Sequence, residues 1–489
     1  MASGELYRLL GVTATATPEE IAAAYREAQR QVQQHAGTAA EIEHQLQQLA
    51  NAYAILSDAE QRAAYDATLT APQATLPLLT AHLTYSSNSL AMLDEPQVLY
   101  LLVELTPTLS SDIPHAPLNL CLVLDRSTSM QGSRLDQVKN AVLKVIDSLQ
   151  PNDIFSVIAF SDRPEVIVSA QSAQGERTIA RAKVSTLNAH GSTEILQGLL
   201  CGLTEMHPHL NSTTANHLIL LTDGRTYGDE DDCLMLARLA ADDGVVIHGL
   251  GIGEEWNDKF LDELTAATGG TAQYISAPKQ VLIFMQEVVR GVSTVYADRI
   301  TLTVQPAREC QLMAAFKILP EAGPLAINDW PVHLGSLPKN QSLSIMLKFL
   351  VPAITATEQI NLAQLHFQAD ILGLGRRGEQ LLVDVNRPIS RDPSKQPPPP
   401  ALLSALSKMA HYTLQERAWQ EASAGNIASA AQRLQTLSTR LLATGQTDLA
   451  KLTLSEARRL ESTHVISEES KKRIKYGTRA LIAPSQHTS

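Results

Sequence analysis

Residues 118–129 read LNLCLVLDRSTS, an almost continuous apolar run that ends in a carboxylate and three hydroxyls. A short apolar run without regular polar alternation is typical of a strand buried on both faces of a parallel sheet. Asp125, Ser127 and Ser129 then lie just beyond the carboxyl end of that strand. Open parallel sheets covered by helices bind their ligands at this edge. The stretch therefore predicts an α/β domain with a candidate site at the end of its first strand.

The same pattern of strand and helix repeats along residues 117–292. Four more apolar runs are predicted strands, at residues 154–160, 217–221, 245–250 and 271–275. Helical segments lie between these runs, for example at residues 135–149, 174–186, 194–206 and 231–242. Short apolar strands that alternate with helices indicate a doubly wound parallel sheet covered on both faces. We therefore predict one α/β domain over residues 117–292.

Three loops of this domain carry oxygen ligands that would meet at one edge of the sheet. Asp125, Ser127 and Ser129 follow the first strand, Thr193 precedes a helix, and Asp223 follows a later strand. Two carboxylates and three hydroxyls are hard donors that suit Mg²⁺, with Mn²⁺ or Ca²⁺ as substitutes, and do not suit zinc. Neutral hydroxyls leave the bound ion electrophilic, so its open position should attract a carboxylate from outside.

This arrangement resembles the von Willebrand factor A domain family over about residues 117–292. Asp125, Ser127 and Ser129 match the family's Asp-x-Ser-x-Ser motif, Thr193 matches its threonine, and Asp223 matches its later aspartate. The resemblance implies a metal-ion-dependent adhesion site in which the three hydroxyls coordinate the ion directly and the two aspartates largely through water. It also implies a partner protein whose Asp or Glu completes the metal shell.

Each of these residues also has a local structural explanation. Ser127 or Ser129 could cap the following helix, and Asp223 with Gly224 could simply turn the chain. The occurrence of all the motif residues in order, on the expected elements, favours the metal site. An intact site could still serve only to hold the loops together. Ser192 stands where the family often has a glycine before the threonine, and we expect it to leave metal binding possible.

Residues 1–69 are predicted to form helices only, with two long helices joined by a short loop. The segments YRLLGV at 7–12, IAAAYR at 21–26, AYAILSD at 52–58 and RAAYD at 62–66 resemble a J-domain of the DnaJ type. That family stimulates an ATP-driven chaperone through a His-Pro-Asp tripeptide in the loop between the helices. Here the loop reads His35-Ala36-Gly37, without the proline and the aspartate. We therefore expect the fold to serve as a docking module rather than to drive a chaperone.

The remaining segments differ in composition from the α/β domain. Residues 70–116 contain a linker and the first strands of an antiparallel β-sandwich. Residues 293–390 are predicted to complete that sandwich, with the α/β domain inserted between the two parts. Residues 391–400 end in four prolines and form a semi-rigid linker. Residues 401–489 are predicted to be helical and are similar to a short tetratricopeptide-like array.

Composition limits the possible functions. The 489 residues include 39 Lys and Arg against 51 Asp and Glu, a net charge of −12, so the basic surface of a nucleic-acid binder is missing. The first residues do not read as a secretory signal, and no stretch approaches the about 20 apolar residues of a membrane span. The four cysteines show no paired spacing. We therefore expect a cytoplasmic protein.

These features predict an adaptor or scaffold, and not an enzyme. Its A domain would bind an acidic side chain of a partner through Mg²⁺, the sandwich would brace that domain, and the two helical ends would recruit other proteins. One alternative is a co-chaperone that acts through residues 4–69. Another is a Mg²⁺-dependent hydrolase, for which His190 is the nearby candidate base.

Two charged runs have simpler explanations. The acidic residues 229–232 are typical of the first turn of a helix, whose dipole they complement, although a second cation site or a specificity loop is an alternative. The basic residues of the run 471–475 favour a solvated helix face, with docking to an acidic surface as the alternative.

Overall fold

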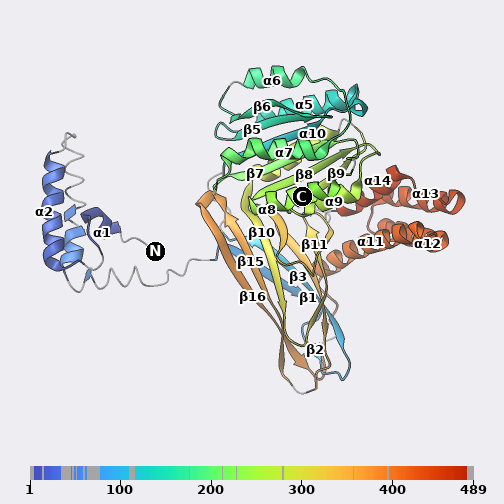
Figure 1. Ribbon diagram of the computed structural model, residues 1–489. Coiled ribbons are helices and arrows are strands. Elements are labelled where there is room, and N and C mark those ends of the chain that lie inside the picture. The colour runs from blue at the N-terminus through green and yellow to red at the C-terminus, as the bar shows by residue number, and fades with distance from the viewer. Residues whose placement is uncertain are drawn as a thin grey trace, which may run out of the picture. The chain divides into compact units, whose positions relative to one another are not determined.

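The computed structural model divides into two compact units, residues 1–76 and 77–489 (Figure 1). The residues that it describes are 5–13, 16–34, 46, 49–50, 52–58, 61–62, 77–108, 116–175, 177–211, 213–226, 228–277, 280–355, 357–393 and 396–481. Among the helices of these ranges, none combines the length and the apolar character needed to span a bilayer.

The N-terminal unit contains α1 (Glu5–Leu10) and α2 (Pro18–Gln34), with further helical residues at 52–57. Thr17 and Glu20 form a capping box at the start of α2: the amide of Glu20 donates to Thr17 Oγ1 over 3.3 Å, and the amide of Thr17 donates to Glu20 Oε2 over 2.7 Å. A small core is built from Tyr7, Leu10, Ala16, Ile21, Leu49, Ala52 and Leu56. The predicted His35-Ala36-Gly37 loop lies outside the described residues.

A six-stranded sheet with the order β6-β5-β4-β7-β8-β9 forms the centre of the second unit. Its strands are β4 (Leu118–Asp125), β5 (Ile154–Phe160), β6 (Pro164–Ser172), β7 (Ala215–Thr222), β8 (Val245–Ile252) and β9 (Ala272–Ile275). All neighbouring strands are parallel except β5 and β6, which form an antiparallel hairpin. The edge strand β6 was not expected from the sequence, where its half-exposed residues break the apolar pattern.

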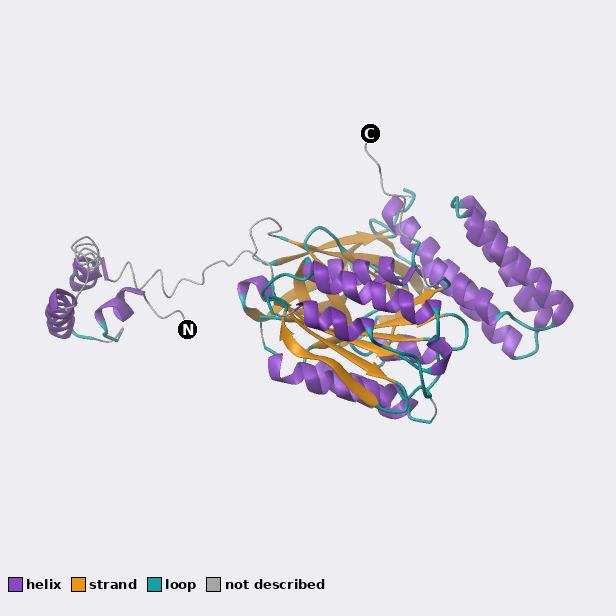
Figure 2. Cartoon of the chain, turned by 90° about the horizontal axis from the view of Figure 1, so that it is seen from above, coloured by secondary structure: helices purple, strands orange, loops and turns teal. Residues whose placement is uncertain are grey.

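Helices cover both faces of this sheet, as the view from above shows (Figure 2). One hydrophobic cluster joins the sheet to α5 (Ser133–Ser148), α6 (Arg177–Ser185) and α10 (Gln280–Ser293). The other joins it to α7 (Ile195–Met206), α8 (Glu230–Asp242) and α9 (Asp258–Ala266). Strand β4 contributes to both clusters, because successive side chains of a strand point to opposite faces of the sheet. Its even-numbered leucines belong to the first cluster, and Cys121 and Val123 belong to the second.

The second unit also contains two five-stranded sheets. Their strand orders are β1-β3-β14-β11-β12 and β13-β10-β15-β16-β2. Their strands are β1 (Leu79–Tyr85), β2 (Leu90–Ala91), β3 (Gln97–Pro107), β10 (Val295–Pro306), β11 (Gln311–Leu319), β12 (Gly323–Leu325), β13 (Val332–Pro338), β14 (Leu343–Val351), β15 (Gln359–Ile371) and β16 (Arg376–Ser390). All pairings are antiparallel except that of β2 with β16. Both sheets contribute side chains to one hydrophobic cluster. Strands that precede and follow the six-stranded domain therefore share a core.

Residues 396–481 of the C-terminal segment form four helices, α11 (Pro400–Ser423), α12 (Ile427–Ala443), α13 (Thr447–Thr463) and α14 (Glu468–Arg479). Gly425 lies in the turn between α11 and α12, and Gly445 lies in the turn between α12 and α13. Their φ values are 81° and 79°, a backbone conformation that glycine adopts without strain. Helix α11 also packs on a five-stranded sheet, where the Phe316 and Tyr412 rings meet edge to face with centroids 5.1 Å apart.

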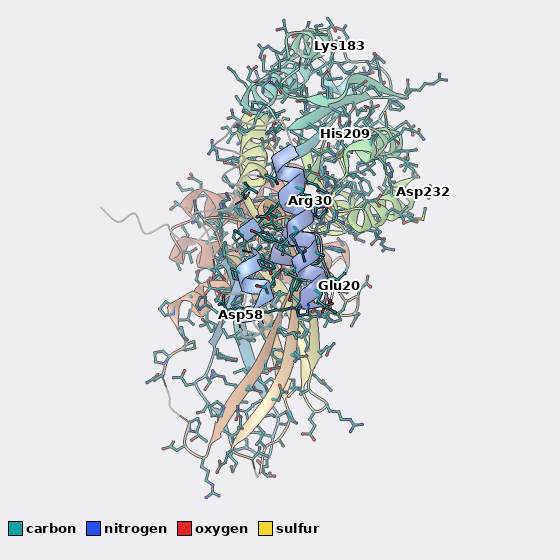
Figure 3. All side chains as sticks on the ribbon, turned by 90° about the vertical axis from the view of Figure 1, so that its left-hand side faces the viewer. Glu20, Arg30, Asp58, Lys183, His209 and Asp232 are labelled. Atoms are coloured by element: carbon teal, nitrogen blue, oxygen red, sulfur yellow. The ribbon has the colours of Figure 1, made fainter. Side chains whose placement is uncertain are left out.

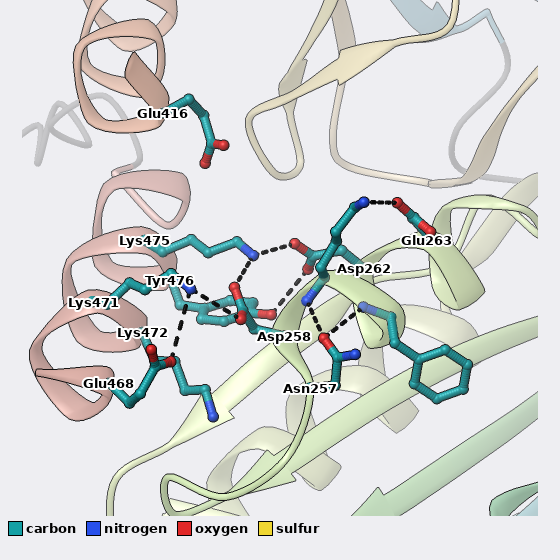
Figure 4. A network of polar contacts seen from close by, with 12 residues as sticks. Asn257, Asp258, Asp262, Glu263, Glu416, Glu468, Lys471, Lys472, Lys475 and Tyr476 are labelled. Atoms are coloured by element: carbon teal, nitrogen blue, oxygen red, sulfur yellow. Dashed lines mark hydrogen bonds and ion pairs between the residues drawn. The ribbon is translucent and has the colours of Figure 1, made fainter. Parts of the chain in front are cut away.

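Helix α14 carries the basic run at residues 471–475, and it docks on the six-stranded domain (Figure 4). The Lys472 side chain is completely buried, and its ammonium donates to the carbonyl oxygens of Glu254 and Trp256. Lys475 pairs with Asp258, and at 2.7 Å with Asp262. The interpretation as a solvated face is therefore wrong for these two lysines, and the alternative, docking to an acidic surface, is realised within the chain itself.

The acidic run at residues 229–232 lies at the start of a helix, as the simpler explanation predicts. Glu230, Asp231 and Asp232 lie in the first turn of α8, where the partial positive charge of the helix end favours carboxylates. Asp232 projects from that helix into solvent (Figure 3).

Candidate metal centre

The candidate ligands lie at the carboxyl ends of two neighbouring strands and in an adjacent loop. Asp125 is the last residue of β4, and Asp223 directly follows β7, which pairs with β4 in parallel. Ser127 directly precedes the short 3₁₀ helix Thr128–Met130 that follows β4, Ser129 lies within it, and Thr193 lies ahead of α7. The topology therefore brings the candidates of all three loops to one edge of the sheet.

Hydrogen bonds connect the candidates from separate loops. The Ser127 and Ser129 hydroxyl oxygens are 3.0 Å apart, and Ser129 Oγ donates to Asp223 Oδ1 over 2.7 Å. Thr193 lies beside them, because a Cβ added to Gly224 would lie only 2.7 Å from Thr193 Oγ1. The hydroxyls and carboxylates are thus in place for a shared ion, while their role as metal ligands stays a prediction.

Asp125 is fully buried, and neutral donors satisfy both of its oxygens. The amide of Ser127 donates to Oδ1 over 2.8 Å, and Thr222 Oγ1 donates to Oδ2 over 2.8 Å. Burial raises the pKa of Asp125 to about 6, although these hydrogen bonds act in the opposite direction; the nearby charge of Asp223 raises it further. This carboxylate is held in position at a site where a cation would offset the cost of its burial.

Asp223 is equally buried, but it has a cationic partner that the sequence reasoning missed. Arg134 Nη1 donates to Asp223 Oδ2 over 2.6 Å and lies 3.3 Å from the carbonyl oxygen of Ser129. Arg134 is the second residue of α5, where the helix dipole disfavours a positive charge. A basic residue so near the start of a helix, a few positions after the motif, is the signal that could have identified it.

The donor set fits a hard divalent cation. No group of three or more His, Cys, Asp or Glu side chains is placed to share a metal ion within the described ranges, so a nitrogen-rich or sulfur-rich site is not found there. The residues at the sheet edge instead offer two carboxylates and three hydroxyls, which is the chemistry that Mg²⁺ accepts. His190 is the candidate base of a hydrolase. Its Nδ1 atom lies 3.4 Å from the hydroxyl oxygen of Ser161.

Comparisons with known proteins agree with this division of the chain. Residues 119–285 match the model of the von Willebrand factor type A domain, and residues 5–66 match that of the DnaJ domain. Residues 400–484 match the Sll0103-like, C-terminal alpha-helical domain. The two resemblances seen in the sequence are therefore confirmed at the level of the domain.

Two curated relatives illustrate how far the similarity extends. The uncharacterized protein sll0103 from Synechocystis sp. is 29% identical over 386 residues, which cover 76% of this chain and 90% of the relative. Inter-alpha-trypsin inhibitor heavy chain H1 from Sus scrofa is 33% identical over 171 residues, 32% of this chain and 18% of the relative. The chain thus spans about a fifth of the length of that heavy chain.

Solved structures share the fold at low sequence identity. A von Willebrand factor type A protein from Catenulispora acidiphila superposes with a TM-score of 0.69 at 16% identity, over 84% of this chain and 99% of the other. The ArnB paralog VWA2 from Sulfolobus acidocaldarius gives a TM-score of 0.53, also at 16% identity, over 83% of this chain and 99% of the other. The α/β fold predicted for the central domain is confirmed.

Proposed function

We propose that this protein is a binding protein whose von Willebrand factor A domain holds Mg²⁺ and through it captures an acidic side chain of a partner protein. The observation that carries the proposal is the chain of contacts from Ser127 through Ser129 to Asp223, with Thr193 alongside. Separate loops converge there with hard oxygen donors.

The residues of the site would hold the ion, and the ion would bind the partner. Ser127, Ser129 and Thr193 would coordinate the ion directly, and Asp125 and Asp223 would do so largely through water. The bound ion would supply the positive charge that an acidic partner needs. This matters for a chain with a net charge of −12, which on its own repels an acidic surface.

The other parts of the chain fit a scaffold. The two five-stranded sheets, as a β-sandwich, would brace the A domain, because β10 continues from α10 with only Thr294 between them. The DnaJ-like unit and the C-terminal helices would offer further docking surfaces. The protein is proposed to act by binding, without catalysing a reaction.

The first test is the response of thermal stability to Mg²⁺ in the wild type, Asp125→Ala and Asp232→Ala. A ligand bound only by the folded state stabilises it, by about 1.4 kcal/mol at ten times its dissociation constant. We expect the melting temperature of the wild type and of Asp232→Ala, a matched exposed acid on the same domain, to rise with Mg²⁺. Asp125→Ala should not respond. Equal responses of all three proteins would contradict the site.

The second test is affinity capture from an extract of the source cells, with Mg²⁺ or with a chelator. We expect partners that bind the wild type in Mg²⁺ to be lost with chelator and with Asp125→Ala, and retained with Asp232→Ala. If the same partners are captured with chelator and with Asp125→Ala, they bind another surface of the protein.

A further inference from the structure

The carboxylate of Asp223 already has a cation beside it. Its two oxygens accept hydrogen bonds from two groups, Ser129 Oγ at 2.7 Å and Arg134 Nη1 at 2.6 Å. The side chain of Asp223 is completely buried, whereas that of Arg134 is 39% exposed. Desolvation strengthens this pair relative to one on the surface, so the guanidinium neutralises one of the two acids of the site.

Ser129 places the guanidinium and the proposed ion within reach of each other. Its hydroxyl is a proposed metal ligand and its carbonyl oxygen lies 3.3 Å from Arg134 Nη1. A cation held by that hydroxyl would carry the same sign of charge as the Arg134 guanidinium, and like charges repel each other in a partly buried site. A divalent cation held near Asp223, directly or through water, therefore competes with Arg134 for the negative charge of the same carboxylate.

Arg134 is only partly buried at the site. It lies on the first turn of α5, and its other terminal nitrogen runs along Gly253, where an added Cβ would be 3.2 Å from Nη2. The absence of a side chain at Gly253 leaves room for the guanidinium beside the loop after β8. With more than a third of its surface in solvent, the arginine can leave Asp223 without breaking the core.

We infer that Arg134 is a tethered competitor of the metal: it holds Asp223 when no metal is bound, and the ion must displace it to enter. The inference rests on the proposed metal site. It assigns to Arg134 a positioning role that keeps the apo site ordered and lowers its affinity for divalent cations. The site would then respond to the concentration of the ion instead of remaining permanently loaded.

The test compares Mg²⁺ and Mn²⁺ affinities, by titration calorimetry on the full chain, for the wild type, Arg134→Gln and Arg181→Gln. Arg181 is a matched control, because it pairs with Asp147 on the exposed surface of the same domain. We expect Arg134→Gln to bind both ions about tenfold more tightly, since a neighbouring positive charge is removed. Arg181→Gln should bind like the wild type.

Three outcomes are distinguishable. Tighter binding by Arg134→Gln alone supports the inference. Equal or weaker binding by Arg134→Gln, with a wild type that does bind, overturns it and leaves the proposed function intact. Absence of binding by the wild type, by Arg134→Gln and by Arg181→Gln at millimolar ion overturns both.

A second measurement uses the wild type alone, in case Arg134→Gln does not fold. Phenylglyoxal modifies accessible arginines, and peptide mass spectrometry reports the rate at each one. We expect Mg²⁺ to speed the modification of Arg134 severalfold and to leave that of Arg181 unchanged. An unchanged or slower rate at Arg134, in a protein that Mg²⁺ stabilises, would overturn the inference.

Discussion

At the scale of single residues, Gly224 shows how closely the candidate site is packed. An alanine there would place its Cβ 2.7 Å from Thr193 Oγ1, and Thr193 is buried and β-branched, so it has few alternative rotamers. We expect Gly224→Ala to weaken Mg²⁺ binding about tenfold, or about 1.4 kcal/mol, in titration calorimetry. Gly291→Ala, with no atom within 4 Å of the added carbon, is the control and should bind normally.

The buried histidine pair of β7 and β8 makes stability depend on pH. His217 Nδ1 and His248 Nε2 are 3.1 Å apart, and burial lowers the pKa of each to about 3. The unfolded chain therefore binds more protons below pH 6.5, so stability falls as the pH decreases from there toward 3. At pH 5 the lowered pKa of His217 alone reduces the free energy of unfolding by about 2 kcal/mol relative to its value at high pH.

Replacing His217 tests this dependence. We expect His217→Gln to lose stability less steeply than the wild type between pH 6.5 and 4, as measured by chemical denaturation. A comparison at pH 8, where both proteins are neutral at this position, separates the packing cost of the substitution. Parallel curves for the two proteins would show that another group controls the acid response.

Sequence reasoning reached the motif residues of the site but not their neighbours. Asp125 and Asp223 could be placed at one edge because parallel strands end together, which is a property of the sheet. Thr222 could not, and Arg134 could be suspected only from its place at the start of a helix, because the contacts of both with the two aspartates depend on side-chain directions between separate loops. A pattern in the sequence identifies the residues that a motif names, and the structure adds those that hold them.

At the scale of elements, helix α14 depends on Asp262 of α9. That carboxylate pairs with Lys475 at 2.7 Å and with Arg479 at 2.7 and 2.8 Å, and it accepts a hydrogen bond from Tyr476 at 2.9 Å. Removing it would leave two nearly buried cations without this partner. We expect Asp262→Ala to cost about 3 kcal/mol.

The neighbouring Glu263 provides the matched control. It pairs with Lys259 at 3.7 Å on an exposed face of α9, so Glu263→Ala should cost at most about 0.5 kcal/mol. Limited proteolysis and chemical denaturation measure both variants. Similar stabilities of Asp262→Ala and Glu263→Ala would show that the other contacts of α14 hold it in place without Asp262.

The parallel strands of the α/β domain could be predicted because they are apolar without polar alternation, whereas the half-exposed edge strand β6 could not. The docking of α14 could not, since a run of lysines looks the same whether it faces water or a set of carbonyl oxygens. Its partners, Trp256 and Asp262, are more than two hundred residues away in the sequence. Composition indicates the charge of a helix, and only the tertiary structure indicates where that charge lies.

At the scale of the whole molecule, the chain divides after residue 76. The N-terminal unit has its own small core, built around Tyr7, Ile21 and Leu56. We expect removal of residues 1–76 to leave the free energy of unfolding of residues 77–489 unchanged, within about 0.5 kcal/mol, and their Mg²⁺ response unchanged as well, because units that share no core contribute independently. A large loss of stability on truncation would instead show that the two units depend on each other.

The pairing of β3 with β14 has a consequence for synthesis. Strand β3 ends at Pro107 and its partner begins at Leu343, so the ribosome must add more than two hundred residues before the pair can form. At about 5–20 residues per second this takes roughly ten to fifty seconds. During that interval β3 has no β14 to pair with, while the α/β domain, which lies between the two strands in the sequence, is itself being synthesised. The edge of β3 that β14 will cover therefore stays open to aggregation until residues 343–351 have been made.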